Sequence, residues 1–204
     1  RRVLFRSLQR LDAILTIRTV EFEWIDADTR NTIESRATDV TSFDGDWWTP
    51  DGWSTFSSKL VPDPLPKIER CWETFVDQYE LQELVTQIDD HPWVLPPTEL
   101  PTSVHVAFER KYITPMRRLK QWYETISNAL ETLASDPSVD DVVEATAELA
   151  AVNSFNTVFD HSPSELETRL STLSTVVGDR TPEDIDGIGI IPDDRGELDR
   201  RITR

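Results

Sequence analysis

The fold is decided by residues 63–89, which read DPLPKIERCWETFVDQYELQELVTQID. Apolar side chains recur in this stretch at spacings of three and four residues, which is typical of one buried helix face. Asp63 can cap such a helix, and the prolines beside it suit a first helical turn. The stretch therefore predicts an amphipathic helix that ends near Asp89. Its apolar positions are Ile68, Trp72, Phe75, Val76, Tyr79, Leu81, Leu84, Val85 and Ile88.

The same periodicity continues beyond this helix and predicts a bundle of four or five helices over residues 63–178. Residues 91–101 are rich in proline and predict a stiff connector. Further helices are expected from about residue 102, with a kink or a new start at residues 114–115, and from about residue 136 to Phe159. Trp72 and Trp122 each fall in register with other apolar residues, so both are predicted to be buried core residues.

The last predicted helix of the bundle has signals at both ends. Ser162, Pro163 and Glu165 match a capping box with proline at the first helical position. Gly178 suits the C-terminal cap. The density of apolar residues falls after residue 178, so residues 179–204 are expected to form an extended tail.

Residues 8–62 have a different pattern. Apolar and polar residues alternate through Val20, Phe22 and Trp24, which favours a half-buried strand, and residues 32–40 can form a second strand after a turn. Residues 43–53 contain glycine, proline and three tryptophans, which predicts a packed loop. The predicted fold class is therefore α+β and mostly α, with an N-terminal β-hairpin and a Trp-rich loop packed on the helical bundle.

The first seven residues are expected to be foreign to the protein. Residues 2–7 read RVLFRS, which resembles the translated end of a common sequencing adapter. We therefore expect the protein's own sequence to begin near Leu8. On this interpretation, the chain is a C-terminal fragment of a larger protein.

The chain is strongly acidic, with 38 acidic and 21 basic residues and a net charge of −17. The acids are spread along the whole chain, and lysine is much rarer than arginine. Molar salt screens the repulsion that such a surface creates in dilute buffer. We therefore interpret the composition as an adaptation to high salt.

Cellular location is predicted from cysteine usage and hydropathy. Cys71 is the only cysteine, which excludes an internal disulfide and favours a reducing compartment. No run of residues approaches the roughly 20 apolar positions that a membrane-spanning helix needs. We expect a cytoplasmic protein that does not enter a membrane.

Catalytic and metal-binding motifs are not recognisable in the sequence. No glycine-rich phosphate loop is present. Asp26 and Asp28 resemble the start of a calcium loop, but Arg30 and Ala37 stand where two of its oxygen ligands are needed. His91, His105 and His161 are far apart, without the spacing of a helical metal site. No catalytic residue, metal ligand or cofactor is therefore predicted, and an activity as an enzyme stays open.

One segment departs from the acidic background, because it carries five basic residues within eleven positions and no acid. Basic residues can bind phosphates, and aromatic residues beside them can stack on bases. Alternatively, they can pair with acids of neighbouring helices or of a partner protein. The second interpretation is favoured, because phosphate binding weakens steeply with salt. The candidate binding residues are Arg110, Lys111, Arg117, Arg118, Lys120, Trp122 and Tyr123.

Together these patterns favour a non-catalytic helical interaction module of a larger intracellular protein from a halophile. A protein partner or an upstream domain is the expected binding partner. One alternative is a nucleic-acid-associated protein that uses residues 110–123. The other alternative is a fragment of an enzyme whose catalytic residues lie upstream.

Overall fold

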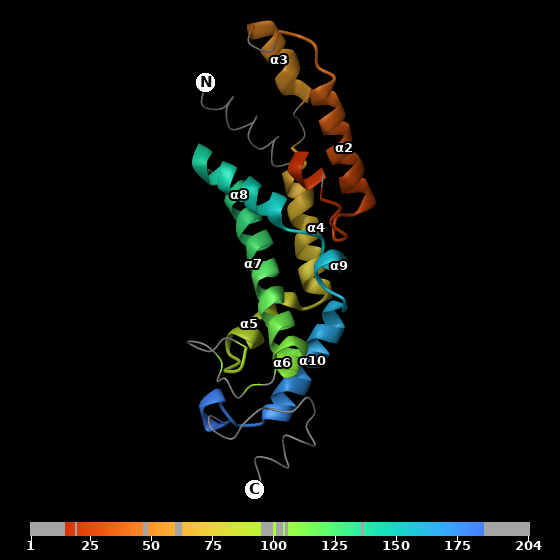
Figure 1. Ribbon diagram of the computed structural model, residues 1–204. Helices are drawn as coiled ribbons and strands as arrows, with labels where there is room; N and C mark the ends of the chain where they lie inside the picture. The colour runs from red at the N-terminus through yellow and green to blue at the C-terminus, as the bar shows by residue number, and fades with distance from the viewer. Residues whose placement is uncertain are drawn as a thin grey trace. The chain divides into compact units, whose positions relative to one another are not determined.

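The structure is a computed structural model and describes residues 15–18, 20–46, 49–59, 63–94, 100, 104, 106–135 and 137–185 (Figure 1). Regular structure in these residues is helical throughout, with no β-strand among them. No described helix combines the length and the apolar composition that a transmembrane span requires. The elements are α2 (Ala27–Thr41), α3 (Pro50–Lys59), α4 (Leu65–Gln78), α5 (Leu81–Asp89), α6 (Val106–Phe108), the π-helix η1 (Glu109–Ile113), α7 (Thr114–Ala134), α8 (Val139–Ala151), α9 (Phe155–Val158), α10 (Pro163–Val177) and the 3-10 helix η2 (Pro182–Ile185).

The prediction of an N-terminal β-hairpin is wrong, because its second strand is part of helix α2. Asp26 caps this helix by accepting a hydrogen bond of 2.7 Å from the Thr29 amide. The helix buries Thr29, Ile33 and Ala37, which recur at every fourth position. The cap and this buried stripe favour a helix over the extended conformation that the alternation indicated.

Of the first strand, which was expected over residues 14–25, residues 15–18 are helical and residues 20–25 make tight turns. The Phe22 amide donates to the Val20 carbonyl at 2.8 Å, and the Ile25 amide donates to the Phe22 carbonyl at 3.2 Å. Phe22 and Trp24 are both buried and their rings stack with centroids 5.0 Å apart. The alternating pattern therefore reflects burial of these rings, which turns achieve as well as a strand does.

The predicted Trp-rich loop is partly helical. Pro50 opens α3, which fits the preference of proline for the first helical turn. Trp53 contacts Phe56 with ring centroids 5.9 Å apart, and Phe43 packs on Phe56 at 5.2 Å. Residues 47 and 48, the other two tryptophans of this segment, lie outside the described residues.

The chain divides into two compact units. Unit 1 comprises residues 1–76 and 124–158, and unit 2 comprises residues 77–123 and 159–204. Helix α7 belongs to both units. Its residues up to Tyr123 are part of unit 2, and its remaining residues are part of unit 1. Within unit 2, α10 packs against α5 and η1.

The core of unit 1 is built around Trp72, which is 6% exposed. Its ring meets Trp24 edge-on at 5.2 Å and stacks on Phe75 at 6.0 Å. Its indole nitrogen donates a hydrogen bond of 3.1 Å to the Ser127 hydroxyl on α7. The predicted burial of Trp72 is therefore confirmed.

The single helix predicted over residues 63–89 is two helices, α4 and α5, separated at Glu80. Glu80 has a φ of 50°, in the left-handed region that a residue with a side chain adopts only at a cost. A continuous helix would turn Gln82, Glu83 and Thr86 toward the core, yet all three are exposed, while Leu81 and Ile88 are fully buried. The apolar stripe changes face at Glu80, and breaking the helix allows both stripes to be buried.

The C-terminal helices follow their predicted caps more closely. The Ser162 hydroxyl accepts from the Glu165 amide, and the Glu165 carboxylate accepts from the Ser162 amide at 2.7 Å, which confirms the capping box of α10. Gly178 ends α10 with a φ of 58°. The prediction of one helix that runs to Phe159 is wrong, because α8 ends at Ala151 and α9 is a separate helix. Of the predicted tail, residues 179–185 are described and end in η2.

Candidate anion-binding surface

The seven candidate residues from the sequence all lie in unit 2, on η1 and the first part of α7. Pro115 shapes this region, because a proline lacks the amide hydrogen that would reach the Lys111 carbonyl four residues earlier. A π-helix precedes it, in which the Thr114 amide donates to the Glu109 carbonyl five residues before. The Lys111 carbonyl accepts a hydrogen bond of 2.9 Å from the Arg169 guanidinium of α10. The irregular turn is thus anchored to α10.

Two of the five basic residues pair with neighbouring elements. Arg117 donates through Nε to the Val94 carbonyl at 2.5 Å, and its Nη1 lies 3.8 Å from the Glu109 carboxylate. Lys120 forms an ion pair of 2.7 Å with Asp89 at the end of α5. These two contacts agree with the interpretation that basic residues of this segment pair with neighbouring elements.

The other three basic residues point to solvent. Arg110, Lys111 and Arg118 are exposed, and no carboxylate of a described residue forms an ion pair with them. The Lys111 ammonium lies 5.0 Å from the ring centre of Tyr112, and the Arg118 guanidinium lies 6.0 Å from the ring of Phe159. Their charges therefore remain available to a ligand.

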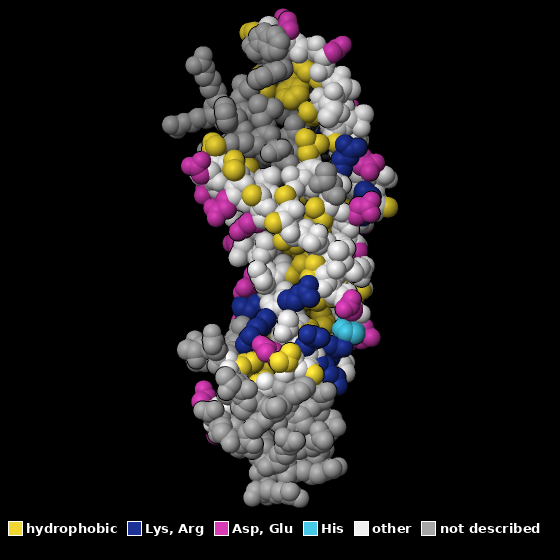
Figure 2. Space-filling model, viewed as in Figure 1, with side chains coloured by type: hydrophobic (Ala, Val, Ile, Leu, Met, Phe, Trp, Pro, Cys, Tyr) yellow, Lys and Arg dark blue, Asp and Glu magenta, His cyan; other side chains and the backbone are white. Residues whose placement is uncertain are grey.

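The structure adds two residues that sequence reasoning missed. Arg169 of α10 reaches the Lys111 carbonyl, and its Nη2 contacts Nε2 of His161 at 2.5 Å. About fifty positions separate them from η1, so no local sequence window brings them together. Figure 2 shows several Lys and Arg side chains close to a histidine on the face drawn, with Asp or Glu side chains beside that histidine as well. We call Arg110, Lys111, Arg118, His161 and Arg169 the basic surface. Arg169 contacts the Lys111 carbonyl and His161, Arg118 lies over the ring of Phe159, two residues before His161, and Arg110 adjoins Lys111 in the chain.

The aromatic residues of the segment belong mainly to the core. Trp122 is 4% exposed and meets Phe159 edge-on at 6.2 Å, which confirms its predicted burial. Tyr112 is also buried, and Tyr123 is half-buried. Trp122 and Tyr112 therefore do not offer the exposed rings on which bases could stack.

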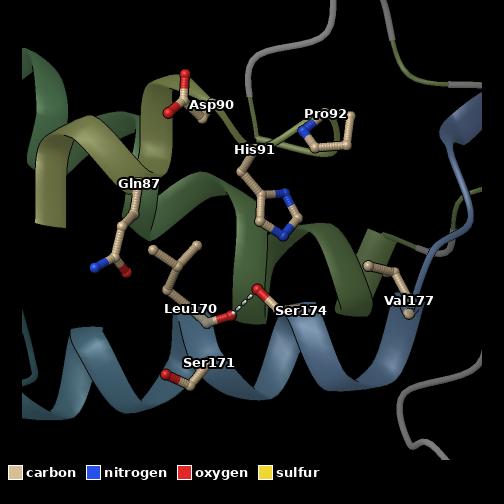
Figure 3. A pocket seen from close by; sticks show the side chains of 9 residues that line it. Gln87, Asp90, His91, Pro92, Leu170, Ser171, Ser174 and Val177 are labelled. Carbon is tan, nitrogen blue, oxygen red and sulfur yellow. Dashed lines mark hydrogen bonds between the residues drawn. The ribbon is translucent and has the colours of Figure 1, made fainter.

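A cleft of about 560 Å³ lies between the end of α5 and α10, also within unit 2 (Figure 3). His91 projects into it beside Leu170 and Ser174. His91 Nδ1 accepts a hydrogen bond of 3.2 Å from the Trp93 amide, and burial lowers the pKa of His91. The neutral ring therefore carries its proton on Nε2. In this tautomer Nε2 can donate a hydrogen bond to a ligand.

Other reactive groups are scarce in the described part of the chain. Cys71 is buried with its sulfur 3.3 Å from the Thr29 hydroxyl, the environment of an inert thiol. The described residues contain no group of three or more His, Cys, Asp or Glu side chains that could hold a metal ion. Comparison of the chain with protein-family models, curated protein sequences and solved structures finds no match. A function is therefore inferred from the basic surface itself.

Proposed function

We propose that the chain is a non-catalytic helical interaction module that binds an acidic protein segment through the basic surface. The observation that supports this proposal is the availability of Arg110, Lys111 and Arg118 to a ligand. The chain carries 38 acidic residues, yet no described acid forms an ion pair with these three cations. Clustered like charges repel one another, and a complementary acidic surface relieves that repulsion.

Arginine suits an acidic protein partner. Its planar guanidinium can bind a carboxylate through two parallel hydrogen bonds, which adds directional specificity to the charge attraction. Direct contacts of this kind are screened less by salt than long-range attraction between separated charges. A short acidic segment also avoids the repulsion that a long polyanion meets from the remainder of a chain with a net charge of −17.

Nucleic acid is the less favoured partner on the same evidence. Binding to single strands combines phosphate contacts with base stacking on exposed aromatic rings. Trp122 and Tyr112 are buried, so the basic surface offers mainly charge. A purely electrostatic contact with phosphates weakens steeply as the salt concentration rises.

The proposal is tested by comparing two labelled ligands of equal charge, an oligo-aspartate peptide and a single-stranded oligothymidylate. Fluorescence anisotropy measures the affinity of the full chain for each ligand at low and at molar KCl. We expect the peptide to bind more tightly and to lose less affinity in molar KCl. Tighter binding of the oligonucleotide would overturn the proposal in favour of a nucleic-acid partner, and failure of both ligands to bind would overturn it outright.

A further inference from the structure

Helix α8 carries an apolar stripe that faces solvent. Val139 and Val143 lie one turn apart and are 43% and 59% exposed, which makes them two of the three exposed large apolar side chains among the described residues. Ala147 and Ala150 are also exposed and extend the stripe over about three turns. The opposite, buried face of the helix consists of Val142, Ala145, Thr146 and Leu149. Burial within unit 1 therefore leaves the exposed stripe without a partner in the described part of the chain.

One border of this stripe is acidic. At 3.6 residues per turn, Asp140, Glu144 and Glu148 follow one side of the stripe, and the buried face adjoins its other side. Glu144 and Glu148 also line a groove of about 380 Å³ between α8 and the part of α7 that belongs to unit 1. The α7 residues of this groove are the neutral Asn128 and Thr132. Figure 2 shows hydrophobic side chains with Asp or Glu side chains beside them at the place of α8 in Figure 1.

The acids of this border are not neutralised within the described chain. Residues 121–158 include seven acidic residues and no Lys or Arg. None of the described cations forms an ion pair with Asp140, Glu144 or Glu148. Hydrogen bonds from the side chain and the backbone amide of Ser138 hold the pKa of Asp141 below its usual value, so this carboxylate in the groove also stays ionised near neutral pH. The exposed stripe therefore lies beside uncompensated negative charge.

This charge decides which occupant suits the stripe. An antiparallel pair of α8 helices from two copies of the chain would place their acidic borders side by side, and like charges across an interface repel. A partner with Lys or Arg beside its apolar residues complements both parts of the surface. Lysine and arginine have long apolar stems, which can cover the valines while their charged ends reach the carboxylates.

The spacing of the stripe favours a helical partner. Exposed apolar residues at positions 139, 143, 147 and 150 form a ridge along α8, and such ridges pack into the grooves between side chains of a second helix. Two of the four are alanines, whose small side chains allow a close approach of the partner's backbone. Amphipathic helices commonly bind proteins by laying their apolar face on an exposed apolar surface.

We propose that the exposed stripe of α8 binds a basic amphipathic helix of a partner protein. The apolar face of that helix covers Val139 and Val143, and its Lys or Arg side chains pair with Glu144 and Glu148. The stripe belongs to unit 1 and the basic surface to unit 2, so the two surfaces involve different residues and take partners of opposite charge.

The test uses two labelled peptides of equal length and equal lysine content. One is an amphipathic Leu–Lys peptide, and the other has serine in place of every leucine. Fluorescence anisotropy measures the affinity of the full chain for each peptide at low and at molar KCl. We expect the Leu–Lys peptide to bind more tightly and to keep more of its affinity in molar KCl, because salt screens charge attraction and does not weaken apolar burial.

Two double variants test the two parts of the surface. Val139→Ser with Val143→Ser should bind the Leu–Lys peptide about tenfold more weakly, because the partner no longer buries the two valine side chains. Both residues are exposed, and serine and valine have similar helix propensities, so thermal stability should hardly change. Glu144→Gln with Glu148→Gln should weaken binding about fivefold at low salt, as expected from two exposed charge pairs.

A third double variant, Glu34→Gln with Glu73→Gln, is the matched control. It removes the same charge from exposed positions of α2 and α4, which also belong to unit 1, and should bind the Leu–Lys peptide as the wild type does. Losses in both α8 variants but not in the control would support the proposal.

Three other outcomes would overturn it. Equal affinity for the two peptides, or unchanged binding by the valine variant, would show that the stripe makes no apolar contact with the partner. Equal losses in the two glutamine variants would mean that overall charge governs binding. A wild-type chain that elutes as a dimer in size-exclusion chromatography and becomes monomeric in the valine variant would assign the stripe to a second copy.

Discussion

Replacing Trp72 by alanine lowers the free energy of unfolding by about 3 to 5 kcal/mol, the typical cost of truncating a buried tryptophan. The ring is 6% exposed and lies against Trp24 and Phe75, so alanine leaves a cavity at the centre of unit 1. It also leaves the Ser127 hydroxyl without its indole donor. Urea denaturation in molar KCl, followed by circular dichroism, measures the loss.

Two further variants separate packing from hydrogen bonding at this position. Ser127→Ala removes the acceptor alone and should cost about 1 kcal/mol. Trp72→Phe keeps most of the ring contacts and should fall between Ser127→Ala and Trp72→Ala. A denaturation midpoint of Trp72→Ala equal to that of the wild type would contradict the packing of α4 described above.

The largest effect on binding is expected from removing the three exposed cations together. The triple variant Arg110→Gln, Lys111→Gln and Arg118→Gln should bind oligo-aspartate about thirtyfold more weakly at low salt, if each exposed charge pair contributes roughly 0.7 kcal/mol. Its thermal stability should be close to that of the wild type, because all three side chains are exposed. Anisotropy titrations and thermal melts of the same samples measure both quantities.

A second triple variant controls for net charge. This variant combines Arg18→Gln, Lys59→Gln and Arg70→Gln. It removes the same charge from unit 1, where these side chains are exposed or half-buried. It should lower the affinity for oligo-aspartate only slightly. Equal losses in the two triple variants would mean that overall charge, and not the basic surface, governs binding.

Helical periodicity was the most informative part of the sequence. It predicted the apolar positions of α4 and α5 and both ends of α10. Buried helix faces and caps depend on residues only a few positions apart, so they can be predicted from a short stretch of sequence. The break at Glu80 was also present in the sequence as a change in the face of the apolar stripe. It was not recognised, because both halves satisfy the same spacing rule.

The errors arose where local patterns have two structural solutions. Alternation around Phe22 fits a strand or a pair of tight turns, and the capping of α2 by Asp26 decides between them. The basic segment is evident in the sequence as one stretch of chain, but its division into paired and open cations depends on tertiary contacts. Arg169 and His161 join the surface only through the packing of α10 on η1.

Zero-length carbodiimide cross-linking of oligo-aspartate to the chain tests most directly whether the basic surface is the binding site. The reagent joins a carboxylate to a lysine amine in contact with it, and the chain has four lysines for peptide mapping: Lys59, Lys67, Lys111 and Lys120. Lys67 and Lys120 are already paired with Asp28 and Asp89, so internal cross-links are expected there. We predict that oligo-aspartate becomes attached mainly to Lys111. Attachment mainly to Lys59 or Lys67, with Lys111 unmodified, would contradict the assignment of the basic surface as the partner-binding site.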